Sequence, residues 1–132
     1  MTMWHGEKGR KKTGGIIKIA RKKRKHELGS LPTHTKIGEE RRKKIRTKGG
    51  NRKIKAFFVQ FANVLDPKTK TSKKVKIIDV VETPANPHFA RRKIIVRGSI
   101  IKTEIGNAIV TSRPSQHGIV NAIALTNEEK KV

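Results

Sequence analysis

Cysteine is absent from this chain of 132 residues. Without thiols, neither a disulfide framework nor a thiolate metal site can form, which excludes cysteine-based zinc fingers. Long apolar runs are missing too: the longest are residues 56–59 and 122–125, whereas a membrane-spanning helix needs roughly 18 apolar residues. Residues 1–6 lack the apolar core of a secretory signal. We therefore expect the chain to stay inside the cell.

Acidic residues are scarce, with 10 Asp plus Glu and five isolated histidines. None of the histidines has a partner at the spacing of a metal-binding pair, such as His-x-x-x-His. Asp79 and Glu82 are three residues apart on an expected strand, which places them on opposite faces. An active site needs convergent polar groups. The sequence predicts no catalytic residue, metal, cofactor or small-molecule substrate, and hence no enzyme.

Positive charge dominates instead: 33 Lys plus Arg give a formal net charge of +23. Such self-repulsion calls for a polyanionic partner. A membrane-surface binder would need an amphipathic apolar face, which the basic segments lack. We therefore expect a nucleic acid and no membrane.

The charge is concentrated in the N-terminal part, because residues 1–55 hold 20 Lys plus Arg against four acids. This part is poor in large apolar residues and is not expected to close a core alone. The sequence predicts a basic RNA-binding extension (residues 1–52), a body (residues 53–127) and a C-terminal tail (residues 128–132).

Three Lys/Arg clusters and the start of the body are the candidate phosphate contacts. An isolated charge run is usually a solvated surface, but three within about 40 residues favour polyanion binding. A nuclear-localisation signal would explain only the second cluster. The candidate RNA-binding residues are Arg10, Lys11, Lys12, Arg21, Lys22, Lys23, Arg24, Lys25, Arg41, Arg42, Lys43, Lys44, Arg46, Lys48, Arg52 and Lys53.

Local patterns predict short helical segments in the extension and strands in the body. Glu39 and Glu40 each precede a lysine by four residues, so residues 38–48 are expected to form a short helix that Gly49 and Gly50 would end. Short apolar runs between turn residues are typical of a small all-β domain. We predict a mainly β fold, a six-stranded antiparallel barrel-like body, with strands at residues 53–65, 73–82, 91–97, 100–104, 108–112 and 119–125.

Aromatic residues that could stack on bases are few. Phe57, Phe58 and Phe61 fall in the first expected strand and are predicted to lie in the core, which leaves Trp4 and Phe89 as the exposed candidates. Phosphate and shape recognition, as expected for folded RNA, is therefore favoured over base readout.

Several ordered motifs resemble one known family. They are Lys-Lys-Thr-Gly-Gly (residues 11–15), Ala-Arg-Lys-Lys-Arg-Lys (20–25), Glu-Leu-Gly (27–29), Gly-Gly-Asn-Arg-Lys (49–53), Ala-Asn-Val (62–64), Asn-Pro (86–87), Val-Thr-Ser-Arg-Pro (110–114) and Gly-Ile-Val-Asn-Ala (118–122). Together they resemble ribosomal protein eight of the small subunit, archaeal and eukaryotic type, over nearly the whole chain. The compact length is similar to that of the archaeal form.

The resemblance implies a cytoplasmic component of the small ribosomal subunit, with small-subunit ribosomal RNA and neighbouring ribosomal proteins as partners. It also implies a barrel-like body and an RNA-binding N-terminal extension. Two turns depart from the family pattern: Lys70 stands where relatives often have glycine, and residues 114–118 differ from the usual Pro-Gly-Gln-Asp-Gly. The alternative from charge alone is an architectural DNA-binding protein, but no groove-reading element or dimer surface is visible.

Overall fold

The computed structural model describes residues 3–7 and 9–125. The chain divides into two units between Pro32 and Thr33, and each is described by itself. The expected C-terminal tail, residues 128–132, lies outside the described residues. The structural division does not coincide with the boundary at residue 52 that the sequence predicts between the RNA-binding extension and the body. That functional boundary remains a prediction.

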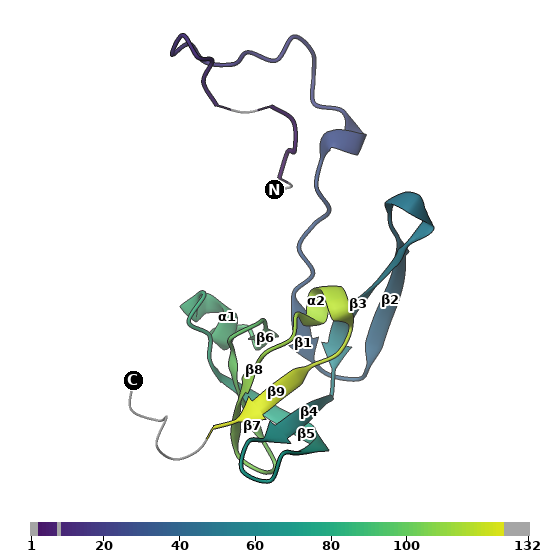
Figure 1. The fold of residues 1–132 in the computed structure, drawn as a ribbon, viewed down its shortest axis with the longest axis vertical. Helices are drawn as coiled ribbons and strands as arrows, with labels where there is room; N and C mark the ends of the chain where they lie inside the picture. Colours follow the sequence, from purple (N-terminus) through teal and green to yellow (C-terminus); the bar gives the residue numbers. More distant parts are fainter. Residues whose placement is uncertain (1–2, 8, 126–132) are drawn as a thin grey trace. The chain divides into compact units, whose positions relative to one another are not determined.

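The first unit has little regular structure (Figure 1). A 3-10 turn, η1 (Lys25–Glu27), follows a loop closed by a bridge between Arg10 and Ile16, and a second bridge joins Trp4 to Leu28. No apolar side chain among the described residues of this unit is fully buried. Its conformation therefore depends on turns and polar contacts rather than on a core.

The second unit contains a closed barrel of five strands in the order β4-β5-β7-β8-β9. They are β4 (Phe61–Asp66), β5 (Thr71–Glu82), β7 (Ile100–Thr103), β8 (Asn107–Val110) and β9 (Asn121–Ala124). Closure is made by a parallel pairing of β4 with β9, and the other pairings are antiparallel. The prediction of a mainly β fold is confirmed. The predicted barrel of six antiparallel strands is wrong, because the barrel has five strands and one of its pairings is parallel.

A second sheet, ordered β2-β3-β1-β6, accounts for the difference. It consists of β1 (Thr35–Ile37), β2 (Arg41–Arg46), β3 (Arg52–Val59) and β6 (Ile94–Ile95). The expected strand at residues 53–65 is interrupted at Gln60, so that β3 joins this sheet and β4 joins the barrel. Buried Ala56 and Val59 of β3 share one core with buried residues of the barrel.

Two predictions of local structure were wrong. The segment at residues 38–48 contains strand β2 (Arg41–Arg46) rather than a helix, because β2 pairs along its length with β3. The expected strand at residues 91–97 is reduced to β6, since helix α1 (Pro87–Arg91) occupies the preceding residues. The Asn86 side chain accepts a hydrogen bond from the amide of His88, and Pro87 takes the first helical position, as favoured at helix starts.

The two segments that depart from the family pattern form a turn at residues 67–70 and a short helix at residues 114–117. Asp66 accepts hydrogen bonds from the Lys68 amide and the Thr69 hydroxyl, and Lys70 adopts a positive φ of 54°. This conformation suits glycine better than lysine. Helix α2 (Pro114–His117) ends at Gly118, where an added Cβ would lie only 2.4 Å from Ile54 Cγ2.

Candidate nucleic-acid interface

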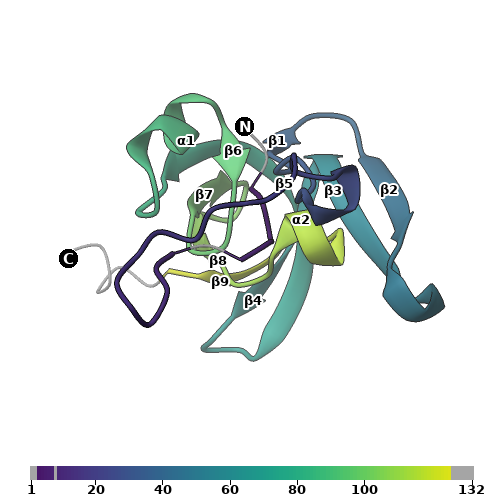
Figure 2. The same cartoon turned by 90° about the horizontal axis from the view of Figure 1, so that it is seen from above.

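Strands β2 and β3 form a hairpin rich in positive charge, here called the basic hairpin (residues 41–59). In both views the two strands lie side by side, and their connecting turn extends beyond the rest of the second unit (Figures 1 and 2). The turn contains η2 (Lys48–Gly50), with Gly49 and Gly50 at positive φ values of 76° and 79°. These glycines therefore close a hairpin rather than end a helix.

The register of the basic hairpin places like charges opposite each other. Lys43 pairs with Lys55, and Arg46 pairs with Arg52. Like charges at directly opposed positions of antiparallel strands are destabilising. The hairpin is anchored to the rest of the second unit through its strand β3. Ala56 of β3 is fully buried and accepts a hydrogen bond of 2.8 Å from the Thr35 hydroxyl of β1.

Few acidic side chains neutralise the positive charge of the basic hairpin. In the part of the chain that the structure describes, the ion pair on the hairpin is that of Arg42 with Glu40, at 3.0 Å. The other candidate residues of this cluster, all exposed, are Arg41, Lys43, Lys44, Arg46, Lys48, Arg52 and Lys53. The third sequence cluster and the start of the body are thus brought together on one element.

Residues 10–12 lie in the loop closed by the Arg10–Ile16 bridge of the first unit. The Lys11 amide donates to the Gly15 carbonyl at 2.7 Å, and the Arg10 guanidinium donates to the Gly14 carbonyl at 2.9 Å. Gly14 has a φ of +83°, which lets the chain reverse. Lys11 and Lys12 are exposed within this loop.

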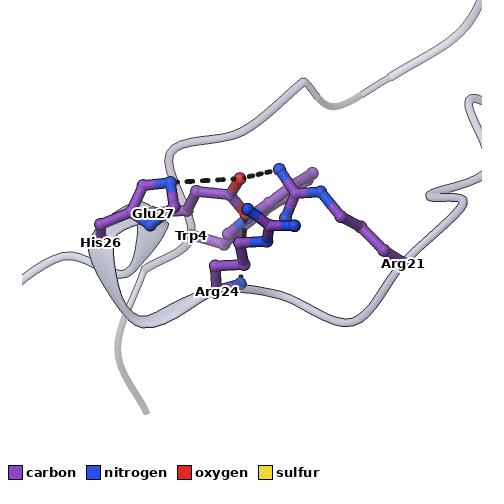
Figure 3. A network of polar contacts seen from close by, with 5 residues as sticks. All are labelled: Trp4, Arg21, Arg24, His26 and Glu27. Carbon is purple, nitrogen blue, oxygen red and sulfur yellow. Dashed lines mark hydrogen bonds and ion pairs between the residues drawn. The ribbon is translucent and has the colours of Figure 1, made fainter.

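Two residues of the cluster at residues 21–25, Arg21 and Arg24, contact the carboxylate of Glu27 (Figure 3). Trp4 Nε1 donates to Glu27 Oε2 at 3.1 Å, and the Arg21 guanidinium pairs with Oε1. The hydrogen bond from Arg21, followed by that from Trp4, lowers the pKa of Glu27 to about 2. Lys23 lies over the Trp4 ring, 5.5 Å from its centroid. Arg21 and Lys23 therefore have contacts inside the chain as well as exposed charge, alongside exposed Lys22, Arg24 and Lys25.

The aromatic side chains are not placed as the sequence suggested. Phe57 and Phe58, expected in the core, are 36 % and 37 % exposed. The expected exposed candidates, Trp4 and Phe89, are half-buried, and Phe89 packs against the His34 ring at 5.5 Å between centroids.

Sequence reasoning also missed Lys55, which lies opposite Lys43. It was overlooked because the clusters were defined by adjacent residues, whereas Lys53 and Lys55 alternate along a strand and so share a face. That spacing was the available signal.

Other kinds of site have little support among the described residues. They contain no group of three His, Asp or Glu side chains arranged to hold a metal ion. No helix in the described ranges is long and apolar enough to cross a membrane. Asp79 lies 3.2 Å from the Lys93 ammonium. A hydrogen bond from the Val80 amide, followed by the one from Lys93, lowers the pKa of Asp79.

Comparison with known proteins gives consistent matches. The family model described as Ribosomal protein S8e matches residues 4–125. A protein named small ribosomal subunit protein eS8 from Saccharolobus solfataricus is 51 % identical over 132 residues, covering 99 % of both chains. Another of the same name, from Sulfolobus acidocaldarius, is 53 % identical over 126 residues, covering 95 % of this chain and 98 % of its own.

Proposed function

Because the chain belongs to the ribosomal protein S8e family, we propose that it binds and stabilises folded small-subunit ribosomal RNA through phosphate contacts. It is a structural constituent of the small ribosomal subunit, of archaeal type, and not an enzyme. Its place is the cytoplasmic ribosome, where its partners are ribosomal RNA and neighbouring ribosomal proteins.

The observation that carries the RNA-binding proposal is the like-charge pairing of the basic hairpin. Lys43 faces Lys55 and Arg46 faces Arg52 in a hairpin whose connecting turn extends beyond the rest of the second unit. Phosphates placed along the hairpin would turn this repulsion into attraction, since each cation then has an anionic partner. Arginine adds bidentate phosphate recognition.

The clusters of the first unit supply the remaining proposed contacts. The exposed Lys11 and Lys12 lie in a loop whose backbone conformation is already fixed by hydrogen bonds. The proposed RNA-binding residues at 21–25 include cations that also hold Trp4 and Glu27. These contacts order the cluster and reduce the entropy lost on binding.

The test has two parts. Mass spectrometry of native ribosomal subunits washed with increasing salt should find the chain in the small subunit, and its absence there would contradict the proposed function. Purified chain should bind small-subunit RNA with a steep salt dependence and more tightly than it binds duplex DNA of equal charge.

A Lys43→Ala, Arg46→Ala double variant locates the contact surface. The slope of log K against log salt should become shallower by about 1.4 to 1.8, because two phosphate contacts are lost at about 0.7 to 0.9 each. The control is Lys76→Ala with Lys102→Ala, which removes the same charge from the barrel strands β5 and β7. Equal losses in both variants would show that net charge, not the hairpin, determines binding.

A further inference from the structure

Phe57 is the extra residue of a bulge in β3. Arg42 pairs with Ala56 and Arg41 with Phe58, so no residue of β2 lies opposite Phe57. A bulge of this kind bends its strand and re-aims a side chain. The Phe57 ring, 36 % exposed, lines a hollow of about 430 Å³ together with Arg41, Arg42 and Lys43.

This combination of groups limits the ligand. The lining is one aromatic side chain and three cations, without a carboxylate. Arg42 is paired with Glu40, whereas Arg41 and Lys43 have no ion pair within the described residues. The hollow thus offers an apolar ring face beside two charges that lack an anion, and a nucleotide presents both complements, a flat π surface and a phosphate.

We propose that Phe57 stacks against one unpaired nucleobase of the bound RNA, while Arg41 and Lys43 hold its flanking phosphates. This inference rests on the proposed function and adds a specific contact to it. Unpaired bases in loops and bulges are the parts of folded RNA that proteins reach by stacking on aromatic rings. The lining has no Asn, Gln, Asp or Glu side chain to read a base edge, so the site accepts any of the four bases.

The neighbouring Phe58 provides the contrast. It lies in a separate hollow of about 490 Å³ lined by Ile37, Gly38, Glu39, Glu40 and Arg41. Its exposure, 37 %, matches that of Phe57. Two carboxylates beside the ring oppose a phosphate, so the Phe58 hollow does not suit a nucleotide. Phe58→Leu is therefore the matched control for Phe57→Leu.

The first test measures RNA affinity across a salt series for the full chain and its variants. Phe57→Leu should weaken binding about 5- to 150-fold, the effect expected for loss of stacking with one base, and should leave the salt slope unchanged. Phe57→Tyr, which keeps an aromatic ring, should stay within about threefold of the unmodified chain, and so should Phe58→Leu. Thermal melting confirms that each variant is folded.

The second test uses native small subunits. Ultraviolet light should cross-link a nucleotide of the RNA to the chain. After digestion with trypsin, mass spectrometry should find that nucleotide on the peptide of residues 56–68, and the fragment ions should place it on Phe57. The stacking site would be overturned, and the proposed function left standing, if Phe57→Leu bound RNA as tightly as the unmodified chain or if Phe57 cross-linked to another protein. Failure of the unmodified chain to bind the RNA would overturn the proposed function itself.

Discussion

At the scale of single residues, Glu27 organises the first unit because four groups converge on its carboxylate. Trp4 and Arg21 donate from their side chains, Arg24 donates from its backbone amide, and His26 lies 3.8 Å away. In a unit without buried apolar side chains among its described residues, these contacts and a few backbone hydrogen bonds take the place of a core. The ionised state of Glu27 should therefore control the local structure.

Acidification should release Trp4 from this network. The hydrogen bonds from Arg21 and Trp4 lower the pKa of Glu27 from 4.5 to about 2 in the folded unit. A lowered pKa means that the stabilisation is complete above about pH 4.5 and is lost as the pH falls through about 2. Trp4 is the only tryptophan of the chain, so its fluorescence should change within this window.

The control for this prediction is Glu27→Gln, which removes the titrating carboxyl group but keeps the size and shape of the side chain. Its Trp4 emission should resemble that of the acid form at every pH and show no transition between about pH 4.5 and 2. If the variant kept the transition of the unmodified chain, another group would be responsible and the proposed role of Glu27 would be wrong.

At the scale of elements, the sequence predicted strand positions better than strand partners. The apolar pattern predicted one strand over residues 53–65, and Ala56, Ala62 and Val64 of that segment lie in the core. It also placed Phe57 and Phe58 in the core, because an apolar run does not reveal which of its faces another layer covers. The exchange of sheets at Gln60 depends on tertiary pairing, which no local pattern encodes.

Strand β2 was mistaken for a helix for the same reason. Glu–Lys pairs at helical spacing are worth only about 0.2 to 0.5 kcal/mol each, and pairing with β3 outweighs them. Glu40, directly before β2, instead pairs with Arg42, two residues along the chain. The candidate cluster was found from composition, but its arrangement opposite Lys55 and Arg52 was not, because cross-strand register is a tertiary property.

Lys55→Glu should separate the stability of the basic hairpin from its function. The variant replaces the repulsion between Lys43 and Lys55 by an attractive pair, which should stabilise the second unit by about 0.2 to 1 kcal/mol. RNA binding should weaken, and its salt slope should become shallower by about 0.7 or more, since the variant loses a cation that we propose to face a phosphate. Urea unfolding and filter binding measure the two effects.

Lys76→Glu is the control for this prediction. Lys76 is exposed on β5 opposite Phe61 rather than opposite a cation, so the same change in net charge should give no comparable gain in stability. A Lys55→Glu variant that is less stable than the unmodified chain would contradict the account of the hairpin as strained by its own charge.

At the scale of the whole molecule, composition and structure divide the chain at different places. Charge density changes near residue 55, but β1 and β2 precede that point and belong to the second unit. β1 lies between β3 and β6 and pairs with both. Removing it would uncover apolar residues of the core, among them Val59, Ile94 and Ile95, which are at most 1 % exposed.

Two truncations therefore have opposite expected outcomes. A chain lacking residues 1–32 keeps every strand of the second unit, and it should fold cooperatively and melt within a few degrees of the main transition of the full chain. A chain lacking residues 1–50 loses β1 and β2. Each large apolar side chain that it exposes costs about 1.5 to 3 kcal/mol, against a total stability of about 5 to 15 kcal/mol, so its cooperative melting transition should be lost. Circular dichroism during heating checks both, and identical transitions in the two truncated chains would show that β1 is dispensable.

The truncation of residues 1–32 also removes ten Lys plus Arg and two Glu. If half of these cations contact phosphates, the salt slope of RNA binding should fall by about 3.5 to 4.5, while the basic hairpin retains measurable affinity.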